Sequence, residues 1–116
     1  MSKKKVNNSE ITYKGNTYAL VFNLNVMEDI QEEYGSVEAW GNLVEDEKEP
    51  SAKAIKYGFT AMLNEGIDIY NEENDDNRKP FTVKQVGRMI SEIGLSAVAN
   101  KLNATVVEST KSDEKN

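Results

Sequence analysis

The sequence predicts a single small domain of the α+β class that is mostly helical, with an N-terminal β-hairpin packed on a bundle of four to five short helices. Apolar and polar residues alternate on both sides of Gly15-Asn16, which is typical of a hairpin. From Asn25 onward, apolar residues recur at spacings of three and four, which is typical of helices. With 116 residues and no cysteine, the chain is long enough to bury a core without disulfides.

The hairpin strands are expected at about residues 10–14 and 17–22. The Gly15-Asn16 pair between them tolerates the positive φ values of a tight turn. Because an isolated two-stranded hairpin is marginal in water, we expect a helix to cover one of its faces.

The first helix is predicted to begin at Asn25, a good N-cap, and to end at Gly35. Its apolar side follows helical spacing: Val26, Met27, Ile30 and Tyr34. Its other side is rich in carboxylates. A catalytic acid–base pair would need two carboxylates in a cleft with separated pKa values, so we interpret this side as a solvated helix face.

Two further helices follow. Ser36 is predicted to cap a short helix over about 37–46, with Trp40, Leu43 and Val44 on its apolar side. Ser51 is predicted to cap the longest helix, over about 52–70. Its apolar stripe is Ile55, Phe59, Met62, Leu63, Gly66 and Tyr70.

Residues 71–80 are polar and acidic, and we expect a mobile, solvated loop, since no register fits the spacing of a calcium-binding EF-hand. A capping box, Thr82 with Gln85, then opens a helix. Its predicted buried residues are Val83, Val86, Ile90 and Ile93. Gly94 separates it from one more short helix that ends near Leu102.

The expected domain therefore spans 10–103, between a flexible N-terminal tail over 1–9 and a disordered C-terminal tail over 104–116. The chain has neither histidine nor cysteine, which excludes Ser-His-Asp and Cys-His catalysis and most metallohydrolase chemistry. No phosphate-cradling glycine loop occurs. We expect no enzyme activity, no cofactor and no metal site.

The net charge of −6 and the acidic stretch from Glu28 to Glu49, with nine carboxylates and one lysine, disfavour nucleic-acid binding. No apolar run is long enough to span a membrane, and the lysines near the start precede no apolar signal region. We therefore expect a cytoplasmic protein without membrane contact.

The segment "ITYKGNTYALVFNLNVMEDIQEEYGSVEAW" resembles the opening of the small tail assembly chaperones of long-tailed phages and prophages of Gram-positive bacteria. That group tends to begin with "YxGxxYxLxF(N/D)LN", followed by an acidic helix that ends in "YGS". The matching residues are Tyr13, Gly15, Tyr18, Leu20, Phe22, Asn23, Leu24 and Asn25, then Tyr34, Gly35 and Ser36. "AMLNEGIDIYNEE" (61–73) and "FTVKQVGRMISEIG" (81–94) are also similar, so the resemblance covers most of 10–103.

The resemblance implies a non-enzymatic protein that binds the tape measure protein, keeps it soluble and promotes polymerisation of the tail tube protein around it. It further implies action in the host cytoplasm and absence from the mature virion. In many relatives a frameshift yields a longer form; whether one exists here, and whether the chain is a homo-oligomer, remain open at this point.

The resemblance supplies no contact residues. On physical grounds we expect partner binding by apolar residues near the hairpin–helix junction and in the second helix, namely Met27, Tyr34, Trp40 and Leu43. We expect Trp40→Ala to weaken partner capture and to leave the fold largely intact. The alternative for each is a place in the core. Two other functions stay open: an acidic inhibitor or DNA mimic that binds a basic host protein, and a structural head–tail or tail subunit.

Overall fold

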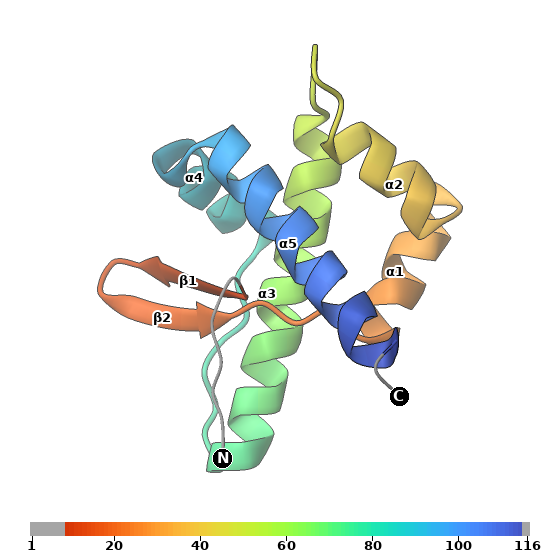
Figure 1. Ribbon diagram of the computed structural model, residues 1–116. Coiled ribbons are helices and arrows are strands. Elements are labelled where there is room, and N and C mark those ends of the chain that lie inside the picture. Colours follow the sequence, from red (N-terminus) through yellow and green to blue (C-terminus); the bar gives the residue numbers. More distant parts are fainter. Residues whose placement is uncertain (1–8, 115–116) are drawn as a thin grey trace.

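The computed structural model describes residues 9–114, which form a two-stranded antiparallel hairpin followed by five helices (Figure 1). The elements are β1 (Glu10–Tyr13), β2 (Asn16–Ala19), α1 (Leu24–Tyr34), α2 (Val37–Val44), α3 (Ala52–Asn74), α4 (Val83–Ile93) and α5 (Leu95–Glu114). The predicted fold class, α+β and mostly helical with an N-terminal hairpin, is confirmed. The flexible tail expected over 1–9 falls, apart from Ser9, outside the described residues.

Helix α3 is the centre of the domain. Figure 1 shows it running through the middle of the molecule, with α5 crossing it, α4 and the hairpin on one side, and α1 and α2 on the other. Its predicted stripe is buried from Ile55 to Gly66, while Tyr70 is half-buried. The stripe meets fully buried side chains from the surrounding helices: Val26, Ile30, Val86, Met89, Val98 and Leu102.

The hairpin turn lies one residue earlier than predicted. Tyr13 pairs with Asn16, so Lys14 and Gly15 form the two-residue loop, with φ values of 51° and 83°. Positive φ at both positions matches the type I′ turn, whose twist suits the strands. As expected, a helix covers the hairpin: β2 approaches α3 so closely that a Cβ on Gly66 would collide with the Ala19 carbonyl oxygen.

Helix α1 begins one residue before the predicted N-cap. Asn23, and not Asn25, is the cap: its backbone is extended and its side chain accepts a hydrogen bond from the Val26 amide at 3.3 Å. The side chain of Asn25 instead donates to Glu65 on α3 at 3.1 Å. The Asn23 side chain also donates to Glu65, at 2.8 Å, so both asparagines of the "NLN" motif tie the start of α1 to α3.

The acidic loop expected over 71–80 is shorter than predicted. Residues 71–74 complete α3, and Asp75 ends it in the left-handed conformation. The rest of the loop runs back along α3 and is held there by hydrogen bonds from two asparagine side chains of that helix. Asn71 accepts from the Arg78 amide and donates to the Arg78 carbonyl, both at 3.0 Å. Asn64 does the same with Phe81, at 2.8 and 2.9 Å.

The disordered tail expected over 104–116 is wrong for residues 104–114, because α5 continues to Glu114. The reason is that the helical spacing of inward residues does not stop at Leu102. Thr105 is 3% exposed and satisfies its hydroxyl by donating to the Lys101 carbonyl at 2.9 Å, and Val106 packs on the core. The sequence pattern did not predict this extension, because threonine is polar and does not continue an apolar stripe.

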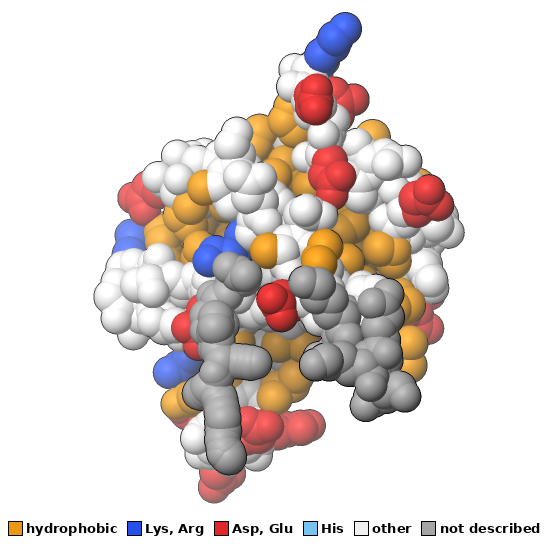
Figure 2. Space-filling view, in the orientation of Figure 1, with side chains coloured by type: hydrophobic (Ala, Val, Ile, Leu, Met, Phe, Trp, Pro, Cys, Tyr) orange, Lys and Arg blue, Asp and Glu red, His pale blue; other side chains and the backbone are white. Residues whose placement is uncertain are grey.

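On the face that carries α5, apolar side chains reach the surface beside α4 and beside α2 (Figure 2). None of the helices between residues 9 and 114 combines the length and the apolar character that crossing a bilayer requires.

Candidate functional site: a groove on the third helix

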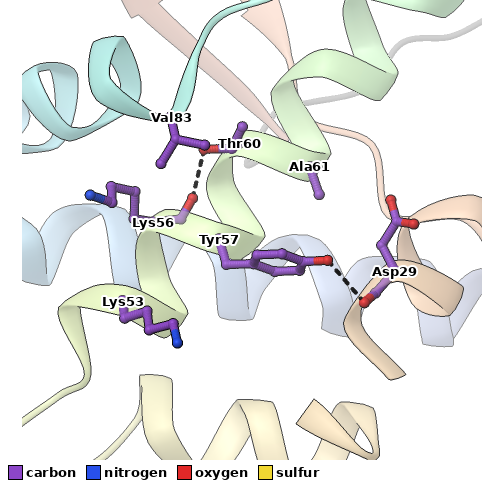
Figure 3. A pocket seen from close by; sticks show the side chains of 7 residues that line it. All are labelled: Asp29, Lys53, Lys56, Tyr57, Thr60, Ala61 and Val83. Carbon is purple, nitrogen blue, oxygen red and sulfur yellow. Dashed lines mark hydrogen bonds between the residues drawn. The ribbon is translucent and has the colours of Figure 1, made fainter. Parts of the chain in front are cut away.

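An open groove of about 450 Å³ lies on the side of α3 opposite the core. Its lining residues are Asp29, Lys53, Lys56, Tyr57, Thr60, Ala61 and Val83, and we call this the α3 groove. Figure 3 shows these side chains in front of α3, with the pale blue ribbon of α5 passing behind it. The groove therefore occupies the face of α3 that α5 leaves uncovered.

The floor of the groove follows from helical periodicity. Its five α3 residues recur at spacings of three and four, and they fall on the face opposite the buried stripe that includes Ile55 and Phe59. The Thr60 hydroxyl donates to the Lys56 carbonyl at 2.8 Å, so it is satisfied within the helix. The floor that remains is largely the Tyr57 ring, the Ala61 methyl and aliphatic stems.

The two walls come from α1 and α4. On one side, the Tyr57 hydroxyl donates to the backbone carbonyl of Asp29 at 3.0 Å, which ties α1 to α3. On the other side stands Val83, the first residue of α4. Val83 is held in place because the predicted capping box between Thr82 and Gln85 is present, with both bonds formed.

A second hollow of about 350 Å³ continues the groove toward the start of α3. It is lined by Ala52, Lys53, Lys56, Gly87, Ile90, Ser91 and Leu95. The two hollows share Lys53 and Lys56. The Lys56 side chain lies over α4 at Gly87, where an added Cβ would be 3.4 Å from its Cδ. The two hollows therefore meet at the side chains of these two lysines.

The two sides of the groove carry opposite charges. Burial, and then the nearby carboxylates of α1, led by Asp29, raise the pKa of Tyr57 above its ordinary value of 10.0. Burial, and then Glu33, raise the pKa of Tyr34 in the same way. The carboxylates of α1 therefore lie on one side of the Tyr57 ring, while Lys53 and Lys56 bring positive charge to the other side.

An unsatisfied hydroxyl lies beside the groove. The ring of Tyr34 packs edge-on against that of Tyr57, with centroids 5.6 Å apart. The Tyr34 hydroxyl is buried without a hydrogen-bond partner in the described part of the chain. A buried hydroxyl without a partner normally costs about 1–3 kcal/mol, so the contact between α1 and α3 is not optimised for stability.

The four predicted partner-binding residues do not form one surface. Met27 and Tyr34 are half-buried on α1, and Tyr34 reaches the groove only through Tyr57. Leu43 is 42% exposed on α2, outside the α3 groove.

Trp40 is a core residue. It is 2% exposed, its indole N–H donates to the Ala54 carbonyl at 2.9 Å, and its ring lies against Gly58. The choice of Trp40 as a surface anchor is therefore wrong, and Trp40→Ala would damage the fold.

The groove residues were missed because only one stripe of α3 was considered. Tyr57 and Ala61, four residues apart, are apolar side chains outside the buried stripe, and they were the available signal. Two of the four α4 residues that were predicted to be buried are not. Val83 is 52% exposed and Ile93 is half-buried, whereas Met89, which was not predicted, is buried.

Two other hollows, of about 250 and 110 Å³, lie against α5 on its α2 side. Both are smaller than typical ligand sites, which start at about 300 Å³. Among residues 9–114, no group of three histidine, cysteine, aspartate or glutamate side chains is arranged to hold a metal ion. Of these four hollows in the described part of the chain, the α3 groove is the largest. Comparison of the chain with protein-family models, curated proteins and solved structures gives no match.

Proposed function

We propose that this chain is a non-enzymatic phage tail assembly chaperone, which binds the tape measure protein, keeps it in solution and promotes polymerisation of the tail tube around it. The α3 groove is the observation that carries the proposal: an open, largely apolar trough between two helical walls. The sequence resemblance over residues 10–103 supports the same function independently.

An apolar floor between two helices suits the apolar face of an amphipathic helix. A helix with its side chains is about 10–12 Å across, and helix-binding grooves take its apolar face as a row of side chains at positions i, i+3 or i+4, and i+7. A tape measure protein is long and helical, so it would present many such rows. Covering them with a domain of net charge −6 would reduce their self-association.

The size of the groove fits a transient role. Its α3 floor runs from Lys53 to Ala61, a rise of about 12 Å, which is roughly two helical turns. Contacts of that extent dissociate quickly, and differences between related complexes lie mostly in the dissociation rate. Tube subunits could therefore displace the chaperone in the host cytoplasm, and it would be absent from the mature virion.

Co-expression with the long helical protein encoded beside it tests the proposal. We expect the partner to move into the soluble fraction and to co-purify with this chain. If the partner stays insoluble and the chain captures a basic host protein in a salt-sensitive way, the inhibitor alternative replaces the proposal. If purified phage particles contain the chain, the structural-subunit alternative replaces the proposal.

Two matched variants locate the binding surface in the same assay. Val83→Glu puts a charge in the groove, while Leu43→Glu puts one on α2, and both side chains are about half exposed in the native fold. We expect Val83→Glu to abolish capture and Leu43→Glu to preserve it. The opposite pattern would move the binding site to α2.

A further inference from the structure

Opposite charges lie on the two sides of the α3 groove. Figure 3 shows Lys53 and Lys56 on one side of the Tyr57 ring and Asp29 on the other. Helix α4 also carries two exposed basic residues, Lys84 and Arg88, outside the lining of the groove. This basic flank is unusual in a chain whose charge balance is strongly acidic.

The α1 flank is acidic beyond Asp29 itself. Glu32 and Glu33 are both exposed, and both help to raise the pKa of Tyr57, whose hydroxyl bridges α1 and α3. Because the apolar floor lies between the two flanks, an occupant with an apolar stripe would have one side against the acidic flank and the other against the basic flank.

From this arrangement we propose that the α3 groove fixes the direction of the helix that it binds. The occupant is an amphipathic helix with an apolar stripe, carboxylates on the side that faces Lys53 and Lys56, and lysines or arginines on the side that faces α1. The inference rests on the proposed function, in that the occupant is a segment of the helical partner. It adds the partner's charge pattern and its polarity along the groove.

Geometry makes charge pattern and direction equivalent. Reversing a helix end for end in a groove exchanges its left and right flanks while the apolar stripe stays in place. One direction therefore puts opposite charges together on both flanks, and the other puts like charges together on both. Complementary rim charges act mainly on orientation and specificity, and like charges penalise the wrong arrangement.

The lysine side chains are suited to this role. Lys56 is half-buried, with its aliphatic stem against α4 at Gly87, so its stem can cover apolar surface while its ammonium group reaches the rim. Lys53 is exposed and lies one turn earlier on the same face of α3. Both lysines line the groove, and Figure 3 shows them on the same side of the Tyr57 ring, away from Asp29.

Three synthetic three-turn peptides test the proposal against the full chain. All have the same leucine and alanine stripe and the same numbers of glutamate and lysine. The first carries glutamate on one flank and lysine on the other, the second has the flanks exchanged, and the third has both charges mixed on each flank. Equal composition keeps non-specific attraction constant. We expect the two sorted peptides to bind roughly ten-fold more tightly than the mixed one at low salt.

Direction is read by NMR with a spin label on the peptide N-terminus. In the first peptide the label should broaden amide signals at one end of the groove, near Lys53 or near Ala61. Exchanging the flanks should move the broadening to the other end. Equal affinities for sorted and mixed peptides, or broadening that stays at the same end, would overturn the proposal.

Variants of the two lysines provide the control. Lys53→Glu with Lys56→Glu makes both flanks acidic, so the sorted peptides should lose their advantage over the mixed one. Lys53→Gln with Lys56→Gln removes the charge without reversing it and should reduce the advantage, which keeps the test available if the first variant folds poorly. A sorted-peptide advantage that survives both changes would refute the role of these lysines.

The outcomes separate this inference from the proposed function. If the wild-type chain solubilises its co-expressed partner while sorted and mixed peptides bind equally, the function stands and the directional groove fails. If the sorted peptides bind with the expected directions while the partner stays insoluble, the groove stands and the chaperone function fails.

Discussion

The packing of Trp40 on Gly58 permits a sharp stability prediction. Gly58 lies in the middle of α3, where alanine would normally be preferred by about 1 kcal/mol. A Cβ added there would collide with Cζ2 of Trp40 and would lie 2.9 Å from its Cε2 and 3.1 Å from its Nε1. Because the indole is fixed in the core, Gly58→Ala should force it to move.

The cost follows from what that movement disturbs. Overpacking a core typically costs about 1–3 kcal/mol. Displacement of the indole also breaks its 2.9 Å bond to the Ala54 carbonyl and leaves a buried donor without a partner, which adds about 1–3 kcal/mol. After subtracting about 1 kcal/mol for helix propensity, we expect Gly58→Ala to lower the free energy of unfolding by about 3 kcal/mol.

Gly41→Ala is the matched control, because Gly41 is also helical and an added Cβ would meet nothing within 4 Å. That variant should be more stable by about 0.5–1 kcal/mol. Urea unfolding, followed by tryptophan fluorescence and by circular dichroism, measures both. A Gly58→Ala variant as stable as the wild type would show that the indole is free to move, and the packing argument would be wrong.

Three further predictions concern the tyrosine pair and the asparagine contacts. Tyr34→Phe should raise the free energy of unfolding by about 1 kcal/mol, because it removes an unsatisfied buried hydroxyl. Tyr57→Phe should lower it by about 0.5–1.5 kcal/mol, because it loses the hydrogen bond to α1. Urea titrations that find Tyr57→Phe more stable than Tyr34→Phe would contradict this. Both tyrosines have a raised pKa in the folded state, so stability should be intact below pH 10 and fall as the pH rises above it, less steeply in the double phenylalanine variant; equal alkaline slopes would contradict the burial argument. Asn64→Ala should lower the free energy of unfolding by about 2–3 kcal/mol, because two backbone groups of Phe81 lose their partner in a half-buried site. Asn71→Ala should lower it by only about 1 kcal/mol, because water replaces the side chain at Arg78. Equal losses of stability in thermal unfolding would count against burial as the cause.

The fold class and most helix starts could be predicted because local signals set them. Ser36, Ser51 and Thr82 each cap the helix that follows, as predicted, and each does so through its own side chain. The end of α5 could not be predicted in this way, because Thr105 is buried by tertiary contact and its hydroxyl is satisfied inside the helix.

The α3 groove was beyond the reach of sequence patterns for a different reason. Its walls come from Asp29 and Val83, which are 54 residues apart in the chain and meet only through α3. Helical periodicity identifies which face of α3 is buried, but it does not show which neighbours stop short of covering the other face. Trp40 illustrates the reverse error, since its residue type favours interfaces while its contacts place it in the core.

The two asparagine contacts on α3 also set the length of the chain segment between Arg78 and Phe81. Asn64 and Asn71 are seven residues apart on a helix, a rise of about 10.5 Å. Their partners, Phe81 and Arg78, are three residues apart in a chain that can extend by about 3.3 Å per residue, which spans nearly the same length. The match ties loop length to position: an extra residue before Arg78 only enlarges the turn, whereas one between Arg78 and Phe81 would put the two contacts out of step and shift α4 along α3.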